Sequence, residues 1–452
     1  MHAASTATAA GRTAEGSRPA LRSRADHAAV PGLIALVAVA AEVAARVLIK
    51  LHGNVSGLAL IGNVYGHPGQ LPAGVRVFHY AGYDGQFYYR MGRNPASLHW
   101  SAYGVTLDEW YRLVRIGYSA LAWLGSGGVP AALPYALVII NVLAIGAIGA
   151  LGGALAQQAG RHALWGLLLA AYFGLITSVS RDTAEPLAAA FLLAALVALR
   201  GRRPLSAALL LACGTLTRET VMVAVAAIGV VRVVTMVRTR RLPGRDDLPW
   251  VLPTVVFVAW QLVIYAVTGS VALATDGGRN AGTPFTAPLH ALLTSLKHIN
   301  TAQFTDQTNV WLLEFFGLAL CCVAATAVLR ASRAPSWEKL ALYLYIVEIC
   351  VVTPNTWDSL DADMRSFIEV YLLAVVILLS VPPGRFGARY GWVLPAVAVW
   401  LVPAAAAVVT RRLTISFRAL SPAAGAGPGH RFPGPRLTGA GPAPSAIYPA
   451  AP

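Results

Sequence analysis

Charge is scarce in this chain. Of its 452 residues only 12% are charged, against roughly 25% in a typical soluble domain, while 56% are hydrophobic and the mean hydropathy is +0.60. One water-facing globule could not hide that much apolar surface, and a disordered chain would be far less apolar. The composition therefore indicates a polytopic membrane protein built from spans of about 20 apolar residues.

Cysteine and lysine are also rare, and their scarcity excludes several classes of site. The four cysteines lie in apolar runs without a CxxC spacing, so we interpret them as small core residues, with neither a disulfide nor zinc. None of the three lysines precedes Ser or Thr, which excludes the phosphate loop of ATP-driven pumps, and no His precedes Glu, which excludes an HExxH zinc site.

Arginine supplies most of the charge. The 35 Lys and Arg outnumber the 20 Asp and Glu and give a net charge of +15. A basic balance can indicate nucleic-acid binding. Arginines at the cytoplasmic ends of membrane helices produce the same excess, so we expect a membrane environment and no nucleic-acid partner.

The hydropathy pattern predicts an all-α protein with about eleven membrane spans, within a range of ten to twelve. Segments 203–217 and 220–238 could instead form one kinked helix or a re-entrant pair, because the polar stretch 214–219 interrupts them. The predicted spans are 30–50, 131–157, 162–180, 184–200, 203–217, 220–238, 248–268, 309–330, 338–353, 366–382 and 390–410.

The arginine distribution predicts the orientation of these spans. With a cytoplasmic N-terminus, every short arginine-rich loop falls on the cytoplasmic side, and Arg411 and Arg412 are the exception. The predicted location is therefore a bacterial cytoplasmic membrane. The predicted domains are a disordered tail at 1–28, a membrane domain at 29–410 with long outer loops at 51–130 and 269–308, and a Pro/Gly/Ala-rich disordered tail at 411–452.

Acidic residues gather on the predicted outer side, and one string there is specific. Asp84 lies between Gly82 and Gly85 in the string Gly-Tyr-Asp-Gly-Gln-Phe-Tyr-Tyr-Arg. The glycines would let the backbone approach a ligand. Asp84 is a candidate catalytic carboxylate, and the alternative is an Asp that caps a helix. The string's other candidates, for substrate binding, are Tyr83, Gln86 and Tyr88.

The long first outer loop and its Tyr-Asp-Gly-Gln-Phe-Tyr string resemble the GT-C superfamily of membrane glycosyltransferases, in particular uncharacterised actinobacterial members. The resemblance covers chiefly residues 30–270. It implies interfacial helices in the loop, a polyprenyl-phosphate-linked sugar as donor, Asp84 as the base on the acceptor hydroxyl, and an inverting displacement. Many members carry an acidic pair there, whereas this chain has Asp84 alone, with Asp108 and Glu109 further along.

Arginines at predicted outer helix ends are candidates for the phosphate of such a donor, because guanidinium binds phosphate in a bidentate manner. The alternative is that these charges pair to hold helix ends, as Glu185 and Arg181 could at i,i+4. A divalent cation bound by Asp361 and Asp363 is also left open. The candidate substrate-binding residues are Arg181, Asp182, Glu185, Arg218, Glu219 and Arg365.

These observations predict a glycosyltransferase that moves a sugar from a polyprenyl-phosphate carrier to a glycan, lipid or protein acceptor of the cell envelope. Two alternatives remain. A transporter or lipid flippase would need polar residues near the centres of several spans, where the sequence offers Glu42, Arg46 and Glu348. A non-catalytic membrane scaffold would need no outer cluster of acids and arginines.

Overall fold

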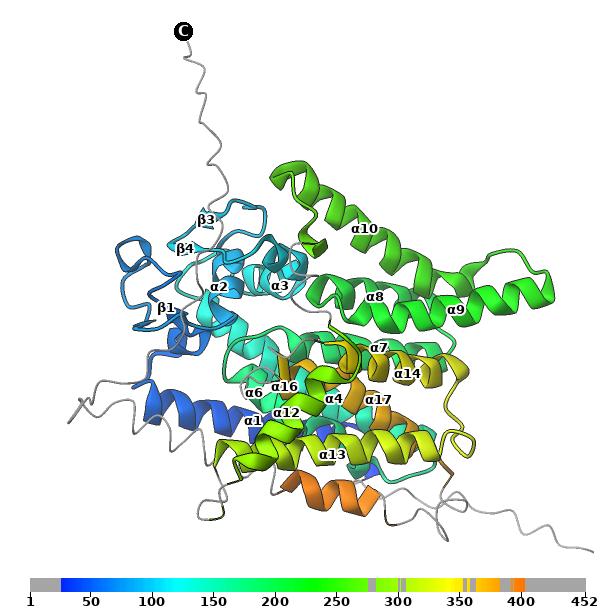
Figure 1. The fold of residues 1–452 in the computed structure, drawn as a ribbon. Coiled ribbons are helices and arrows are strands. Elements are labelled where there is room, and N and C mark those ends of the chain that lie inside the picture. The colour runs from blue at the N-terminus through cyan, green and yellow to red at the C-terminus, as the bar shows by residue number, and fades with distance from the viewer. Residues whose placement is uncertain are drawn as a thin grey trace, which may run out of the picture.

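The computed structural model is a helical bundle with a loop domain at one end (Figure 1). It describes residues 26–274, 282–299, 301, 306–352, 356–357, 363–382, 392 and 394–402. The predicted tails lie outside the described residues, apart from 26–28, where the chain leads into the first helix.

The bundle consists mainly of apolar helices. Its elements are α1 (Ala29–Lys50), α4 (Leu133–Gln158), η5 (Ala163–Gly166), α5 (Leu167–Ala170), α6 (Phe173–Val179), α7 (Glu185–Arg200), α8 (Pro204–Thr217), α9 (Val221–Thr239), η6 (Arg245–Asp247), α10 (Leu248–Thr268), α12 (Thr286–Lys297), α13 (Gln307–Ala327), α14 (Ser336–Val351), α16 (Asp363–Ser366), α17 (Ile368–Leu379) and a helix at 394–402.

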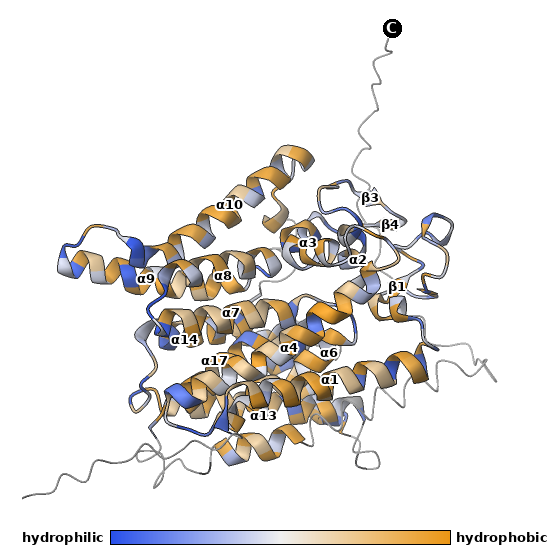
Figure 2. Cartoon of the chain, turned by 180° about the vertical axis from the view of Figure 1, so that it is seen from behind, coloured by the Kyte–Doolittle hydropathy of each residue, from blue (hydrophilic) through white to orange (hydrophobic). Residues whose placement is uncertain are grey.

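Five helices among the described residues are long and apolar enough to cross a membrane, which agrees with the membrane class read from composition. The apolar window of α4 is 61% buried, whereas that of α10 is 17% buried. Helix α4 is therefore central, and α10 presents apolar side chains outward along its length, as a lipid-facing helix does (Figure 2). The full count of about eleven spans stays a prediction.

Segment 162–180, expected as a single span, is broken into η5, α5 and α6. Tyr172 interrupts the helix with an extended backbone (φ −63°, ψ 123°). Its ring stacks on that of Tyr371 in α17, with the centroids 4.3 Å apart. The packing of Tyr172 against α17 thus breaks an apolar run that would otherwise continue as one helix.

Segments 203–217 and 220–238 form two helices, α8 and α9, rather than one kinked helix. The break falls at Arg218, whose backbone is extended (φ −154°, ψ 127°). This conformation turns the Arg218 side chain into the protein, where it is 5% exposed.

The loop domain, residues 51–132, holds short helices and two small sheets, so the protein is not purely α-helical. Strand β1 pairs in parallel with β2, and β3 pairs antiparallel with β4. Helix α2 is buried inside this domain rather than lying on an exposed interface. The elements are η2 (Val55–Ala59), β1 (Ile61–Gly62), η3 (Pro68–Gln70), β2 (Val77–Phe78), α2 (Gly85–Arg93), β3 (Ser101–Ala102), β4 (Val105–Thr106), η4 (Trp110–Arg115) and α3 (Ile116–Gly125).

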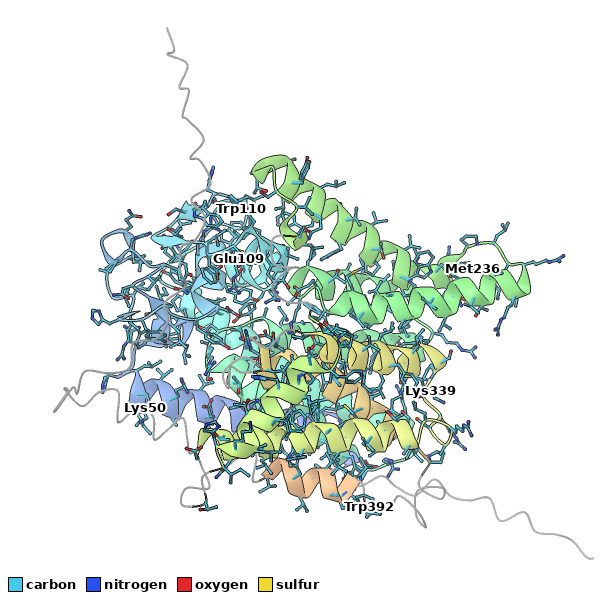
Figure 3. The ribbon with its side chains drawn as sticks, viewed as in Figure 1. Lys50, Glu109, Trp110, Met236, Lys339 and Trp392 are labelled. Atoms are coloured by element: carbon cyan, nitrogen blue, oxygen red, sulfur yellow. The ribbon has the colours of Figure 1, made fainter. Side chains whose placement is uncertain are left out.

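The bundle therefore has two distinct ends, which we call the loop end and the opposite end. Lys50, Glu109 and Trp110 lie toward the loop end, whereas Met236 and Lys339 lie toward the opposite end (Figure 3). The arginine-rich connection between α9 and α10 lies at the opposite end (Figure 1). The loop domain and the arginine-rich connection thus lie at opposite ends along the helix direction (Figure 1).

Candidate functional site

Two glycines fix the backbone around Asp84. Gly82 has a φ of +80°, and a Cβ on Gly85 would lie 2.3 Å from the carbonyl oxygen of Arg181. The α6–α7 turn therefore packs directly on the start of α2. The glycines allow close approach of protein backbone, which corrects the expectation that they make room for a ligand.

Asp84 stands immediately before α2, yet its side chain does not cap the helix. Its Oδ1 accepts a hydrogen bond from Arg112 Nη1 at 2.8 Å, and its Oδ2 accepts one from Arg365 Nη2 at 2.7 Å. The helix-capping alternative is therefore wrong. The carboxylate instead joins η4 of the loop domain to α16 of the bundle, across 281 residues of sequence.

The two arginines set the protonation state of Asp84. Burial alone would raise the pKa of this carboxyl group, but the charges of Arg112 and Arg365 outweigh burial and hold its pKa well below the usual range. Asp84 is therefore ionised at neutral pH, and both of its oxygens are engaged.

The contacts of Asp84 extend into a chain of charges, which we call the Asp84 cluster: Asp84, Asp108, Arg112, Glu185 and Arg365. Asp108 accepts two hydrogen bonds from Arg112, at 2.8 and 2.7 Å. Arg365 Nη1 lies 3.0 Å from Glu185 Oε1. The cluster thus joins η4, α2, α16 and the first residue of α7.

Tyr83 packs against this cluster through its ring. The guanidinium carbons of Arg181 and Arg365 lie 4.3 and 5.0 Å from the ring centroid. Both distances suit cation–π contacts. The expected neighbours Tyr83, Asp84, Glu185 and Arg365 are therefore brought together, with Arg181 beside them.

A second group, the Arg218 cluster, is formed by Tyr111, Arg115, Arg218, Glu219, Thr220 and Glu369. Arg115 donates to Glu219 at 2.8 and 2.6 Å, and the Tyr111 hydroxyl also donates to Glu219. Burial raises the pKa of Glu219, but the charge and hydrogen bonds of Arg115 outweigh this and lower it to about 2. Arg218 donates to both oxygens of Glu369 at 2.9 Å, and Thr220 donates to Glu369 at 2.7 Å.

Three residues that were expected to contact the substrate are buried in the structure. The Gln86 side chain is buried and holds the loop, accepting from the Gly62 amide at 3.2 Å and donating to the Ala81 carbonyl at 3.0 Å. Tyr88 is buried against the ring of Tyr118, 5.4 Å away. These two residues support the site from behind, and substrate contact by them stays a prediction.

Asp182 is the third, and it is fully buried in the α6–α7 turn with a φ of +48°. Neither of its carboxylate oxygens accepts a hydrogen bond from a described residue. Burial raises the pKa of Asp182 well above its usual value, with Arg46 opposing the shift. Asp182 thus lies beneath the surface of the site, and its contact with a substrate stays a prediction.

Arg112, Arg115 and Glu369 were not among the residues expected from the sequence. Arg112 and Arg115 are three residues apart in η4, and residues at i and i+3 of a 3₁₀-helix lie on the same side. Glu369 interrupts an apolar run within predicted span 366–382, where an acid usually has a partner or a function. Both patterns are visible in the sequence, but neither identifies the residue with which the charged side chain pairs.

Several arginine N–H groups of the two clusters still lack acceptors. Arg365 Nε and Nη1, and Arg218 Nε, are buried and donate no hydrogen bond to any described residue. The contact of Arg365 Nη1 with Glu185 is thus an ion pair without hydrogen-bond geometry. Buried unsatisfied donors are costly, and those of Arg365 are suited to an acceptor-rich anion such as a phosphate.

The open question of a divalent cation falls mostly outside the described residues. Asp361 lies outside them, and of Asp363 the structure describes the backbone alone. Elsewhere in the described ranges no group of three or more His, Cys, Asp or Glu is arranged to hold a metal ion.

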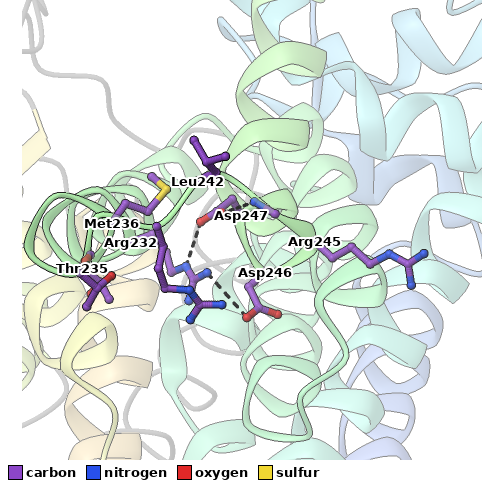
Figure 4. A pocket seen from close by; sticks show the side chains of 10 residues that line it. Arg232, Thr235, Met236, Leu242, Arg245, Asp246 and Asp247 are labelled. Atoms are coloured by element: carbon purple, nitrogen blue, oxygen red, sulfur yellow. Dashed lines mark hydrogen bonds and ion pairs between the residues drawn. The ribbon is translucent and has the colours of Figure 1, made fainter.

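A separate hollow lies at the opposite end, between the end of α9 and the start of η6 (Figure 4). Arg232 there contacts Asp247 at 2.9 Å and Asp246 at 3.7 Å. Arg241 and Arg245 also line the hollow and are exposed. It shares no residue with the Asp84 or Arg218 clusters.

Comparison with solved structures gives a loose likeness. The chain is similar to the crystal structure of ArnT from Cupriavidus metallidurans bound to undecaprenyl phosphate, with a TM-score of 0.37 and 16% identity, over 73% of this chain and 68% of that one. No protein-family model and no curated protein matches the chain. Neither family membership nor an activity follows from a likeness at this level.

Proposed function

We propose that this chain is a GT-C-type glycosyltransferase that moves a sugar from a polyprenyl-phosphate donor to an acceptor of the cell envelope. The observation that carries the proposal is the Asp84 cluster, an ionised carboxylate held between two arginines where the loop domain meets the bundle. A hydroxyl that attacks a lipid-phosphate sugar needs a carboxylate on one side and positive charge at the leaving phosphate on the other.

Arg365 is suited to the leaving phosphate. It is 8% exposed, it touches Asp84 through Nη2, and its Nε and Nη1 donate to no described acceptor. Arg112 lies on the other oxygen of Asp84 and is 22% exposed. A lipid phosphate remains at the membrane surface, so arginines at the end of the bundle are in reach of it.

The transfer is one displacement. The acceptor oxygen forms a bond to the anomeric carbon as the bond from that carbon to the phosphate oxygen breaks, and polyprenyl phosphate leaves with the electron pair. The acceptor hydroxyl proton passes to Asp84. An in-line displacement of this kind inverts the anomeric configuration.

The same arginines that contact the phosphate control the basicity of Asp84. In the free protein their charge keeps its pKa low, which makes the carboxylate a weak base. A phosphate bound to Arg365 and Arg112 would neutralise much of that charge and raise the proton affinity of Asp84. The base would therefore become effective after the donor is bound, which limits transfer to the loaded site.

The proposed orientation follows from charge. The exposed arginines between α9 and α10 lie at the opposite end, and arginine-rich loops are retained in the cytoplasm. The loop end, with the Asp84 cluster, then faces outward. We propose about eleven spans with a cytoplasmic N-terminus in a bacterial cytoplasmic membrane.

The test is a transfer assay in membranes with labelled polyprenyl-phosphate sugars, comparing wild type with Asp84→Asn. We expect the variant to lose about 10²–10⁴-fold in rate at equal expression, the usual contribution of a general base. The matched control is Asp246→Asn at the opposite end, whose side chain is 63% exposed and which we expect to be fully active.

Two outcomes contradict the proposal. Full activity of a well-folded Asp84→Asn protein would remove Asp84 as the base. Uptake or lipid flipping in proteoliposomes without any transfer product would instead favour a transporter.

A further inference from the structure

A cavity lies beside the Asp84 cluster and is walled by the Arg218 cluster. Its lining comes from η4, the α8–α9 turn, the end of α14 and the residues that follow Arg365. The polar residues that matter for its chemistry are Tyr111, Arg115, Arg218, Glu219, Thr220 and Glu348.

The arginines of this cavity are already neutralised. Arg115 is held by Glu219 and Arg218 by Glu369, each pair through two hydrogen bonds. The charges of these two pairs cancel, so the cavity offers no uncompensated positive charge. That balance disfavours a phosphate and favours a neutral group rich in hydroxyls.

Glu348 differs from the other acids around the site. Asp84, Asp108, Glu185, Glu219 and Glu369 each lie within an ion pair. Glu348 lines the cavity, and no described residue donates a hydrogen bond to it or forms an ion pair with it. Among the described acids that line this cavity, Glu348 is thus the one outside an ion pair, whereas the unengaged Asp182 is fully buried and does not line the cavity.

The helix that carries Glu348 is fixed against the cavity wall. Tyr345, three residues earlier on α14, donates a hydrogen bond to the Thr220 carbonyl at 3.0 Å. Residues at i and i+3 lie on the same helix face, so Glu348 faces the same turn. A carboxyl group held in place by a packed helix can favour a ligand whose hydroxyl groups have one arrangement over another.

The cavity adjoins the proposed phosphate contact through the chain itself. Ser366 and Phe367 line it, and Arg365 precedes them directly. Arg218 Nη2 also donates to the Ser366 carbonyl at 3.4 Å. A sugar attached to a phosphate on Arg365 would therefore lie next to this cavity.

We propose that this cavity binds the sugar ring of the donor and that Glu348 accepts hydrogen bonds from its hydroxyl groups, which makes Glu348 a specificity-determining residue. The inference rests on the proposed function, since it assigns one part of the same donor. A carboxyl group can form hydrogen bonds with neutral hydroxyls in either protonation state, and these bonds would satisfy an otherwise unengaged acceptor.

The test compares two kinds of lipid, both measured by direct binding to purified wild type, Glu348→Ala and Glu348→Gln. The first is undecaprenyl phosphate alone, and the second is undecaprenyl phosphate carrying glucose, mannose or arabinose, each tested separately. We expect Glu348→Ala to weaken binding of the preferred sugar lipid about ten-fold or more and to leave binding of the bare lipid unchanged. Glu348→Gln, which keeps one acceptor oxygen, should lose less.

The outcomes separate this inference from the proposed function. Unchanged binding of the bare lipid also shows that each variant is folded. If wild type binds both lipids and Glu348→Ala weakens neither, or weakens both equally, the role of Glu348 is wrong and the proposed donor stands. If wild type binds no sugar lipid more tightly than the bare lipid, the cavity is not a sugar site. If it binds neither lipid, both proposals fall.

Discussion

The two ends of the bundle use arginine in opposite ways. At the loop end, Arg112, Arg115, Arg218 and Arg365 are at most 22% exposed and each is ion-paired with an acid. At the opposite end the arginines of the α9–α10 connection, Arg238, Arg240, Arg241 and Arg245, are exposed. Unbalanced arginine is what orients a membrane protein. Arginine balanced by buried acids is costly to build. One such pair, Arg200 with Glu338 at 2.7 Å, lies outside both clusters, so the loop end is distinguished by its clustering of several pairs.

Breaking the buried ion pair between Arg218 and Glu369 should give the largest difference in stability between the two ends. Glu369→Gln leaves Arg218 as an uncompensated charge, so we expect a loss of about 3–5 kcal/mol in unfolding free energy. Arg232→Gln at the opposite end, where the side chain is 29% exposed, should cost about 1 kcal/mol or less. Thermal unfolding in one detergent measures both.

The double variant Arg218→Met/Glu369→Leu is the control for this comparison. Replacing both partners with apolar residues removes the stranded charge, so it should be more stable than Glu369→Gln. If the double variant is instead the less stable of the two, the ion pair stabilises the folded protein more than two apolar residues do. The difference in stability between the two ends is then larger than we infer.

The pH dependence of stability sharpens the same comparison. The pKa of Glu219 is lowered from 4.5 to about 2 in the folded protein, so its ion pair stabilises the fold fully above pH 4.5 and that contribution is lost as pH falls toward 2. A shift of this size corresponds to about 3 kcal/mol. We expect the stability gap between wild type and Glu219→Gln to be widest above pH 5 and to close toward pH 2. A gap independent of pH would contradict the shift.

Arg365 tests whether pairing at the loop end is shaped for a ligand. Its guanidinium reaches Asp84 with Nη2 and Glu185 with Nη1, which a single ammonium cannot reproduce. We expect Arg365→Lys to lower kcat/KM for transfer by about 10–100-fold. Arg241→Lys at the opposite end is the matched control and should leave transfer unchanged. Equal activity of both variants would mean that charge alone suffices at Arg365.

The sequence predicted the membrane class of this protein and singled out Asp84, because both depend on local patterns. Long apolar runs identify helices without knowledge of their neighbours, and Asp84 stood out from its own glycines and aromatics. The burial of Gln86, Tyr88 and Asp182 was not predicted, because burial depends on packing between distant segments, and their contact with a substrate stays a prediction. Arg112 and Glu369 were missed for the same reason, since their partners lie 28 and 151 residues away.

Two neighbouring acids at the opposite end give the smallest and most controlled test. Asp247 is 4% exposed and accepts from Arg232 Nε at 2.9 Å and from the Gly244 amide at 2.8 Å, whereas Asp246 is 63% exposed and lies 3.7 Å from Arg232. We expect Asp247→Asn to lower the unfolding free energy by about 1 kcal/mol, and Asp246→Asn to change it by less than about 0.5 kcal/mol. The two positions share a loop, a charge and a partner, so burial is the difference between them. Equal losses in thermal unfolding would mean that charge outweighs burial at this end, and the contrast between the two ends of the bundle would then need another cause.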